Sequence, residues 1–512
     1  QRQFSRTQLV FPSGQHPSDL APAELTPPEE GEVREPIVEP GLTTLYFTRS
    51  FQVDDPEQFV ALQVQSRFNK GLEVFINGTR VVMSRLNPEA LEHGDFAIEP
   101  DVPDFIWMDV GYNDRWQNHW DAIPADSLKV GENHISVAVH KLETGEDPAL
   151  YFDLHLRGWH DIGWMKMPYL HAVTQNEVTV SWETTVPSVG EVQILDADDQ
   201  VITRFESSHP SPHHEVRITG LSPDTTYRYR IQAEVPNQAE GIEPLTLMSA
   251  IDPFTTAPLD DMAFNFLFYG DSRFGAGVHR SLVDLMVKDI DTHNTNVVMH
   301  AGDIVSTGYT WDLWHDRFFA PAWPLLSKVP IYPTTGNHEV NQKLYYDYFD
   351  LPGNESWYHV RYGIVDFYAI NTNVDFSPES EQYAWLDKVM SEGEAPWKIA
   401  LFHHPPFACA NGRKSEGGDV REFLVPLLEK HGVDLALLGH DHVYGRSREI
   451  NGVTYVISGG GGSPLYNSST DANMVFCEKK YNYTRFHVGE SSIRWVAIDE
   501  TGDLIDEFTI FQ

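Results

Sequence analysis

The pattern of apolar and polar positions changes twice along the chain. Between about residues 41 and 160, short strands of alternating polarity such as LYFTRSFQV and NHISVAVHK are separated by Gly, Pro and Asn turns. A second set of alternating strands lies within 161–258, with VTVSW at 178–182 and EVRI at 215–218. This pattern predicts two all-β sandwich domains in succession.

From 259 to 512, apolar strands alternate with helical segments, which predicts an α/β domain with helices on the faces of its sheets. Apolar side chains recur at helical spacing and predict helices over 277–291, 379–391 and 419–431, the last closed by Gly432. The expected strands are continuous apolar runs, which is typical of strands buried on both faces. They include 264–269, 297–299, 364–370, 399–402, 435–438 and 453–458.

Residues 1–40 differ from both patterns. They contain seven prolines and little apolar periodicity, which predicts an extended arm without a core of its own. A chain of 512 residues also exceeds what one hydrophobic core holds. The expected fold class is therefore multidomain, with an arm over 1–40, β-sandwiches over 41–160 and 161–258, and an α/β domain over 259–512.

Five segments at the ends of expected strands carry Asp, Asn or His. They read GDSR at 270–273, HAGD at 300–303, GNHE at 336–339, HHPP at 403–406 and GHDH at 439–442. Because the carboxyl ends of the strands line the ligand crevice of an open α/β sheet, we expect these side chains to converge. Carboxylate, amide oxygen and imidazole are ligands that Zn, Fe or Mn accept, so the sequence predicts a metal site.

The order of these segments resembles the calcineurin-like metallophosphoesterases, most closely their purple acid phosphatase branch, over residues 263–512. The resemblance implies one or two divalent or trivalent metal ions (Zn, Fe or Mn), with Asp303 bridging two metal positions. His403 is preferred to His404 because the family's ligand stands two residues before the proline. The complete ligand set implied by the resemblance is Asp271, Asp303, Asn337, His403, His440 and His442.

Three further residues are candidates for contact with a substrate. His338 follows the implied ligand Asn337 and is expected to hydrogen-bond the phosphoryl group or to protonate the leaving oxygen. Arg273 is expected to bind an anionic substrate, with an ion pair to a neighbouring carboxylate as the alternative. For His404, a direct substrate role and a hydrogen bond that orients a ligand both remain open.

The chain departs from the family pattern at two positions. In the purple branch a tyrosine stands three residues after the bridging Asp, where this chain has Ser306. In the non-purple branch a histidine stands two residues after the first Asp, where this chain has Arg273. One metal position is therefore a ligand short, and Tyr309, His300 or water are the candidates to complete it.

The two β domains also resemble known modules. Residues 220–229 resemble the fibronectin type III signature, in which a tyrosine packs at a sheet corner after a turn. VFING at 74–78 and GEN at 131–133 resemble jelly-roll modules of secreted glycosidases. Such modules sometimes bind sugar, so Trp107, Trp116 and Trp120 are candidates for stacking on a sugar, with packing as the alternative.

The charge and the cysteine content limit the classes of partner and the cellular compartments that we expect for this protein. With 75 acidic and 36 basic side chains the net charge is −39, which disfavours nucleic acid and anionic membrane surfaces. No apolar run is long enough to span a bilayer. The acidic composition and the start at Gln1 fit a secreted or periplasmic protein with a cleaved signal peptide, and a shortened chain is the alternative explanation of that start. Cys409 and Cys477 are expected to form one disulfide rather than two buried thiols.

The expected function is metal-dependent hydrolysis of phosphate monoesters or diesters by a metal-bound hydroxide, the activity of an acid phosphatase-like hydrolase. The partner is then a small anionic ester, and a link to carbohydrate and the oligomeric state both stay open. One alternative is an enzyme with a single metal that acts on sulfate esters or acidic polysaccharides. The other is a glycan-binding protein without catalysis.

Overall fold

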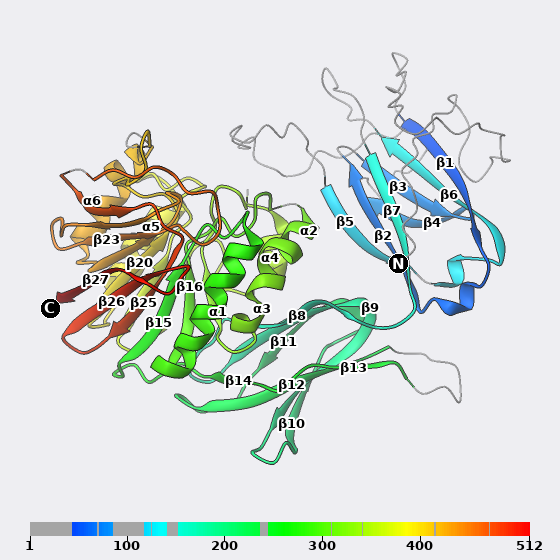
Figure 1. The fold of residues 1–512 in the computed structure, drawn as a ribbon, viewed down its shortest axis with the longest axis horizontal. Helices are drawn as coiled ribbons and strands as arrows, with labels where there is room; N and C mark the ends of the chain where they lie inside the picture. Colours follow the sequence, from blue (N-terminus) through cyan, green and yellow to red (C-terminus); the bar gives the residue numbers. More distant parts are fainter. Residues whose placement is uncertain are drawn as a thin grey trace. The chain divides into compact units, whose positions relative to one another are not determined.

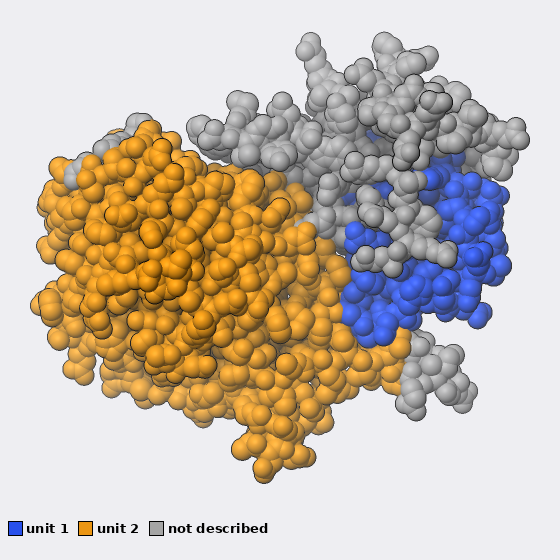
Figure 2. Space-filling model, in the orientation of Figure 1, with its two compact units in different colours: residues 1–163, 185–187 blue, residues 164–184, 188–512 orange. Residues whose placement is uncertain are grey.

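A computed structural model gives the fold of residues 44–68, 71–84, 117–123, 125–140, 152–235, 244–308, 310–339, 341–413, 416–470 and 472–512. The chain divides into two compact units, residues 1–163 with 185–187, and residues 164–184 with 188–512 (Figure 2). The expected arm over 1–40 and the side chains of Trp107, Trp116 and Trp120 lie outside the described residues.

The first unit contains two antiparallel sheets, with strand orders β1-β6-β3-β4 and β5-β2-β7 (Figure 1). Val64 of one sheet and Val74 and Val139 of the other are buried in a common core, so the unit is the β-sandwich that the alternating pattern predicted. The strands are β1 (Thr44–Val53), β2 (Ala61–Phe68), β3 (Gly71–Ile76), β4 (Thr79–Ser84), β5 (Gln117–Ile123), β6 (Gly131–His140) and β7 (Phe152–Trp159), with short 3₁₀ turns η2 (Pro56–Gln58) and η3 (Ala125–Ser127).

The second unit begins with a further set of β-strands. The long strand β9 pairs with β8, β10, β11 and β12. The Tyr227 hydroxyl accepts a hydrogen bond from the Ser222 backbone N–H at 2.8 Å, which is the tyrosine after a turn that the fibronectin-like signature predicted. The strands are β8 (Trp164–His171), β9 (Val178–Leu195), β10 (Val201–Glu206), β11 (Ser211–Ile218), β12 (Thr226–Glu234), β13 (Thr246–Met248) and β14 (Asp252–Thr255).

The remainder of the second unit is built on two packed sheets. In one, the parallel strands β17-β16-β15 continue into antiparallel β25-β26-β27, and β17 pairs with β8; the other has the order β18-β19-β20-β21-β23-β22-β24. The ring of Phe266 on β15 meets that of Phe367 on β19 edge to face, 5.4 Å away, where the two sheets touch. The described residues from 264 onward form β15 (Phe264–Tyr269), β16 (Thr295–His300), β17 (Ile331–Pro333), β18 (Tyr358–Tyr362), β19 (Val365–Ala369), β20 (Trp397–Phe402), β21 (Leu435–Leu438), β22 (Tyr444–Ser447), β23 (Thr454–Ser458), β24 (Met474–Glu478), β25 (Asn482–Val488), β26 (Ser492–Asp499) and β27 (Leu504–Phe511).

Helices flank these sheets (Figure 1). Leu386 of α5 and Leu427 of α6 pack into one core with strands β19, β20, β21 and β23. The three expected helices are present, and Gly432 follows α6 with a φ of 63°, in the left-handed region where helices commonly end. The helical elements are α1 (Ala276–His293), α2 (Trp311–Leu313), the π-helical η4 (Trp314–Phe319), α3 (Ala320–Leu326), α4 (Lys343–Tyr348), α5 (Glu381–Glu392), the π-helical η5 (Val420–Leu424) and α6 (Val425–Lys430).

The helices α2 to α4 were not predicted. The run from 311 to 326 contains Pro321 and Pro324, which interrupt helical hydrogen bonding and conceal the period of its aromatic side chains. None of the helices in the described ranges has the length and apolar character needed to cross a bilayer.

Candidate metal centre

The five strands whose ends carry Asp, Asn or His deliver their following loops to one region. Strands β15, β16 and β17 are parallel neighbours in one sheet, and β20 and β21 are parallel neighbours in the other. The loops after them bring the six candidate ligands together. These are Asp271, Asp303, Asn337, His403, His440 and His442.

The backbone of these loops is unusual where it carries the ligands. Asp271, Asp303 and His440 have φ values of 59°, 53° and 66°, in the left-handed region that costs a non-glycine residue about 1–3 kcal/mol. Such conformations persist where the surrounding structure imposes them. A Cβ on Gly336 would lie 2.3 Å from Asp303 Oδ1, so only glycine allows the loops after β16 and β17 to approach this closely.

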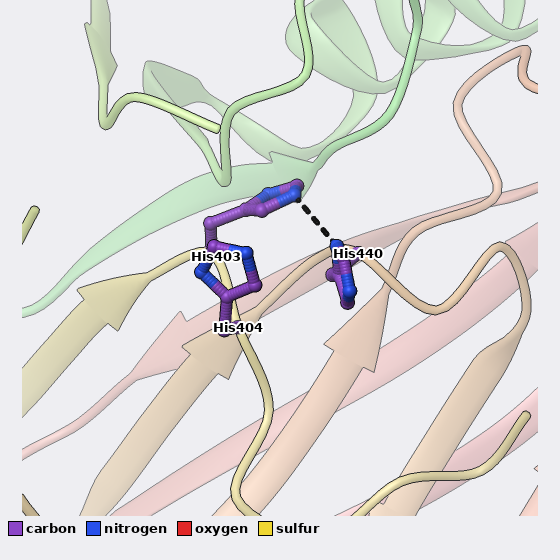
Figure 3. A group of neighbouring side chains, drawn as sticks. All are labelled: His403, His404 and His440. Carbon is purple, nitrogen blue, oxygen red and sulfur yellow. Dashed lines mark hydrogen bonds between the residues drawn. The ribbon is translucent and has the colours of Figure 1, made fainter. Parts of the chain in front are cut away.

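Four polar atoms converge on a first position. Asn337 Oδ1 lies 3.1 Å from both His403 Nε2 and His440 Nδ1, and Asp303 Oδ1 lies 3.4 Å from His403 Nε2. Figure 3 shows the rings of His403 and His440 approaching each other, with their facing nitrogens 3.2 Å apart. The group combines a carboxylate, an amide oxygen and two imidazoles.

Contacts on the outer side of each ring determine which nitrogen offers a lone pair. His403 Nδ1 donates to the Ala301 carbonyl oxygen at 2.8 Å, which leaves Nε2 as an acceptor. His440 Nε2 lies 3.1 Å from Glu416 Oε2 and also contacts Arg413 Nη1, so its Nδ1 is the ring nitrogen that faces Asn337 and His403. Acceptor atoms crowded together in this way fit a metal cation of the Zn, Fe or Mn type.

Asp271 and His442 form a second position. His442 Nε2 lies 3.4 Å from Asp271 Oδ1, both atoms are buried, and neither has a hydrogen-bond partner among the described residues. His442 Nδ1 donates to the Pro464 carbonyl oxygen at 2.8 Å, so its Nε2 lone pair faces the carboxylate. Burial raises the pKa of Asp271 to about 8 and lowers the pKa of His442 to about 4. A cation would satisfy both orphaned atoms.

Of the candidates to complete this second position, His300 has both ring nitrogens engaged elsewhere. Its Nδ1 accepts from the Gly302 backbone N–H at 3.1 Å, and its Nε2 lies 3.3 Å from Ser272 Oγ. Tyr309 lies outside the described residues.

The three residues expected to contact a substrate surround Asp303 and His440. Arg273 is 7% exposed, and its Nε lies 3.2 Å from Asp303 Oδ2, so it makes the ion pair that was its alternative role. His338 Nδ1 lies 2.8 Å from the Ser306 carbonyl oxygen and Nε2 lies 3.9 Å from Asp303 Oδ2. The His404 ring is 4.5 Å from that of His440. Burial lowers the pKa of His338, and burial lowers the pKa of His404 to about 3.

No sequence pattern had indicated a role for Glu339. Its buried carboxylate accepts four backbone hydrogen bonds and so ties the loop after β16 to the loop after β17. Oε1 accepts from Ile304 at 2.7 Å and Val305 at 3.1 Å, and Oε2 accepts from Asp303 at 2.8 Å and Gly336 at 2.6 Å. Its position in the GNHE segment was the available signal.

Glu416, Arg413 and Tyr466 were also missed, because they stand outside the ligand segments and approach His440 and His442 only in the folded chain. Arg413 contacts His440, and it lies 3.1 Å from both Glu416 Oε2 and the Tyr466 hydroxyl. The ring of Tyr466 stacks on that of His442 at 4.2 Å. These three side chains enclose the outer side of the two histidines.

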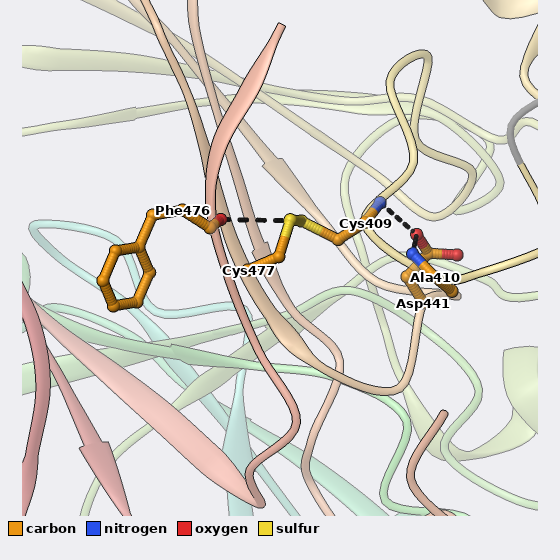
Figure 4. Close-up of a disulfide and its surroundings, with 5 residues drawn as sticks. All are labelled: Cys409, Ala410, Asp441, Phe476 and Cys477. Carbon is orange, nitrogen blue, oxygen red and sulfur yellow. Dashed lines mark hydrogen bonds between the residues drawn. A yellow bond between two sulfur atoms is a disulfide. The ribbon is translucent and has the colours of Figure 1, made fainter. Parts of the chain in front are cut away.

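A disulfide supports the same side of the centre. Cys409 and Cys477 are bridged, which confirms the expected pairing and ties the loop after β20 to β24 (Figure 4). Asp441, which stands between the two candidate ligands of the GHDH segment, accepts backbone hydrogen bonds from Cys409 at 2.7 Å and Ala410 at 2.8 Å. The disulfide loop and the histidine loop are therefore joined directly.

Glu416 offers a test of how His440 is oriented. Replacing Glu416 with Ala removes the acceptor behind the ring and should weaken Zn²⁺ binding by roughly 10-fold or more, because partners that orient a ligand influence metal affinity by about 10–100-fold. Glu416→Gln keeps an acceptor oxygen, so its Zn²⁺ affinity should fall less than that of Glu416→Ala. Zn²⁺ titration of chelator-stripped protein measures both, with the exposed Glu422→Ala as the matched control. Equal affinities for Glu416→Ala and wild type would contradict this role.

Comparison with known proteins identifies two domain families in the chain. Residues 264–444 match the calcineurin-like phosphoesterase family, and residues 168–256 match the purple acid phosphatase N-terminal domain. Among solved structures, a purple acid phosphatase from yellow lupin (Lupinus luteus) seeds superposes with a TM-score of 0.60 at 16% identity, over 92% of this chain and 94% of that one. At that identity the likeness concerns the fold.

Curated relatives come from the same group. Purple acid phosphatase 15 of Arabidopsis thaliana is 26% identical over 298 residues, which is 49% of this chain and 53% of the relative. Probable inactive purple acid phosphatase 27 of the same plant is 25% identical over 361 residues, 58% of each chain. The matched segments thus span less than two thirds of these relatives. The chain carries a calcineurin-like metallophosphoesterase domain preceded by a purple acid phosphatase N-terminal domain.

Proposed function

We propose that this chain hydrolyses small phosphate esters in a metal-dependent reaction. The observation that carries the proposal is the convergence of Asp303, Asn337, His403 and His440 beside the orphaned pair Asp271 and His442. This group of residues lies at the carboxyl ends of strands in a domain of the calcineurin-like phosphoesterase family. A metal held there would polarise a phosphoryl oxygen and lower the pKa of an attacking water.

The protein's own residues bind and orient the ester. Asp303 presents one oxygen to His403 and the other to Arg273, so it joins the metal ligands to the guanidinium. The Arg273 donors suit phosphoryl oxygens. Because the Ser306 carbonyl engages His338 Nδ1, the ring nitrogen available to a bound phosphoryl group or leaving oxygen is Nε2. His404 is held through Nδ1 by Thr372 Oγ1 at 2.7 Å and borders the same space.

Local positive charge at the site offsets the repulsion between the acidic chain and an anionic substrate. A net charge of −39 repels an anionic substrate at long range. Arg273 at Asp303 and Arg413 at His440 place a guanidinium beside two of the candidate ligands. Together with bound metal they supply the attraction that a phosphate ester needs.

We further propose a secreted or periplasmic location. The Cys409–Cys477 disulfide supports it, because such bridges persist in oxidising compartments, and the acidic composition is consistent with it.

The proposed function is tested by hydrolysis of an aryl phosphate, a bis-aryl phosphate and an aryl sulfate. Chelator-stripped chain should be inactive, and Zn²⁺, Mn²⁺ or Fe should restore turnover of at least one of the two phosphates. Comparison of the two distinguishes monoesterase from diesterase activity. Turnover of only the sulfate, or of none by metal-loaded protein, would refute the proposal.

A further inference from the structure

The two metal positions differ in how many protein atoms face them. At the first, His403 Nε2 lies 3.1 Å from Asn337 Oδ1, 3.2 Å from His440 Nδ1 and 3.4 Å from Asp303 Oδ1. At the second, two buried ligand atoms, Asp271 Oδ1 and His442 Nε2, face each other without a hydrogen bond among the described residues. Asp303 is the carboxylate expected to bridge the two positions; its Oδ1 faces His403, and its Oδ2 faces Arg273 Nε at 3.2 Å.

Arg273 is closely surrounded, and its buried Nε makes no hydrogen bond among the described residues. Its backbone carbonyl oxygen accepts a hydrogen bond from Ser306 Oγ at 2.9 Å, and its Nη1 lies 3.1 Å from His338 Nδ1. The guanidinium carbon lies 5.4 Å from the ring centroid of Phe274. A guanidinium remains protonated in proteins, so a permanent positive charge sits against one oxygen of Asp303.

This charge acts on metal binding in two ways. It neutralises Asp303 Oδ2, the oxygen that a metal at the second position would share, and it repels a cation placed beside that oxygen. Both effects are strong because the Arg273 and Asp303 side chains are 8% and 1% exposed, where water screens little. The first position is affected less, because it uses Asp303 Oδ1 and three neutral ligand atoms.

We infer that the centre is asymmetric: Asp303, Asn337, His403 and His440 hold one metal ion tightly, whereas Arg273 supplies the second positive charge at Asp303 and keeps the Asp271–His442 position weak. This inference rests on the proposed function for the presence of a metal centre. It deepens that function, since a bound phosphoryl group then lies between one tightly held cation and a guanidinium.

Zn²⁺ titration of the chelator-stripped full chain tests the inference. Wild type should bind one equivalent tightly and a second at least about 10-fold more weakly. Arg273→Met removes the charge and keeps much of the volume, so it should strengthen the second equivalent by about 10-fold or more. Arg273→Lys keeps the charge and should resemble wild type. Arg280→Met, an exposed arginine on α1, is the matched control and should change neither affinity.

Two ligand variants keep the test decisive if Arg273→Met fails to fold. His442→Ala should leave the tight equivalent unchanged within about twofold, and Asn337→Ala should weaken it by at least about 10-fold. Two equivalents of equal affinity in wild type, no binding at all, or loss of the tight equivalent in His442→Ala would each overturn the inference. One tight equivalent without hydrolysis refutes the proposed function alone, and hydrolysis with two equal equivalents refutes the asymmetry alone.

Discussion

Asp303→Asn is expected to lower the turnover of an aryl phosphate by at least about a thousandfold, because metal stabilisation of a transition state contributes several kcal/mol and each ~1.4 kcal/mol is a factor of ten. Asp303 Oδ1 faces His403 Nε2 and Oδ2 faces Arg273 Nε. An asparagine of the same shape would carry no charge, and its single oxygen could serve only one of these two neighbours. The substitution should therefore weaken metal binding and also the contact that holds Arg273 in place.

The measurement is steady-state hydrolysis at saturating Zn²⁺ together with thermal unfolding, so that a loss of fold is separated from a loss of chemistry. Asp284→Asn is the matched control, because Asp284 is an exposed residue of α1 paired with Arg280 at 2.8 Å. It should retain full activity. Asp303→Asn protein that folds and keeps more than about a tenth of the wild-type turnover would remove Asp303 from the mechanism.

The location of the centre could be predicted from sequence because it depends on strand ends. Apolar runs define the buried strands, and polar residues that directly follow them must emerge at one edge of the sheets. Asp271, Asp303 and His403 each stand within three residues of such a strand. Their backbone conformations could not be predicted in the same way, because the left-handed φ of an Asp or His is imposed by tertiary packing rather than by local preference.

The side chains that surround the candidate ligands could not be predicted from the sequence. Arg273 was expected to bind the substrate, with an ion pair to a carboxylate as the alternative, and only the 3.2 Å approach to Asp303 shows the ion pair. Arg413 and Glu416 follow the HHPP segment in the loop after β20, and Tyr466 lies beyond β23; they reach His440 and His442 only through folding. Long-range contacts of this kind leave no periodic trace in a single sequence.

In the fold, too, local elements could be predicted from the sequence, whereas long-range strand pairing could not. Strand β15 was predicted at its observed bounds from a continuous apolar run, and α1 was predicted to within two residues at each end from the helical spacing of its apolar side chains. The pairing of Ile331 on β17 with His171 on β8 joins the two parts of the second unit in one sheet. That pairing links residues 160 positions apart in the sequence, and nothing in either strand's own pattern identifies its partner.

Glu339→Ala is expected to destabilise the second unit by at least about 4 kcal/mol, because it leaves four buried backbone N–H groups without an acceptor at ~1–3 kcal/mol each. The groups belong to Asp303, Ile304, Val305 and Gly336. Glu339→Gln should lose less stability, since its one remaining side-chain oxygen can still accept hydrogen bonds from two of these N–H groups. Urea unfolding followed by tryptophan fluorescence measures the difference, with the exposed Glu392→Ala as the matched control.

The same substitution separates a packing role from a positioning role. Glu339 Oε2 accepts from the backbone of Asp303 and from that of Gly336, which precedes the candidate ligand Asn337. If the carboxylate holds these two loops in register, Glu339→Gln should weaken Zn²⁺ binding by roughly 10-fold even at a temperature where the variant is fully folded. A variant that is less stable yet binds Zn²⁺ with wild-type affinity would show that Glu339 only supports the fold. Loss of both would identify it as the residue through which the stability of this edge of the sheets and the geometry of the metal centre are coupled.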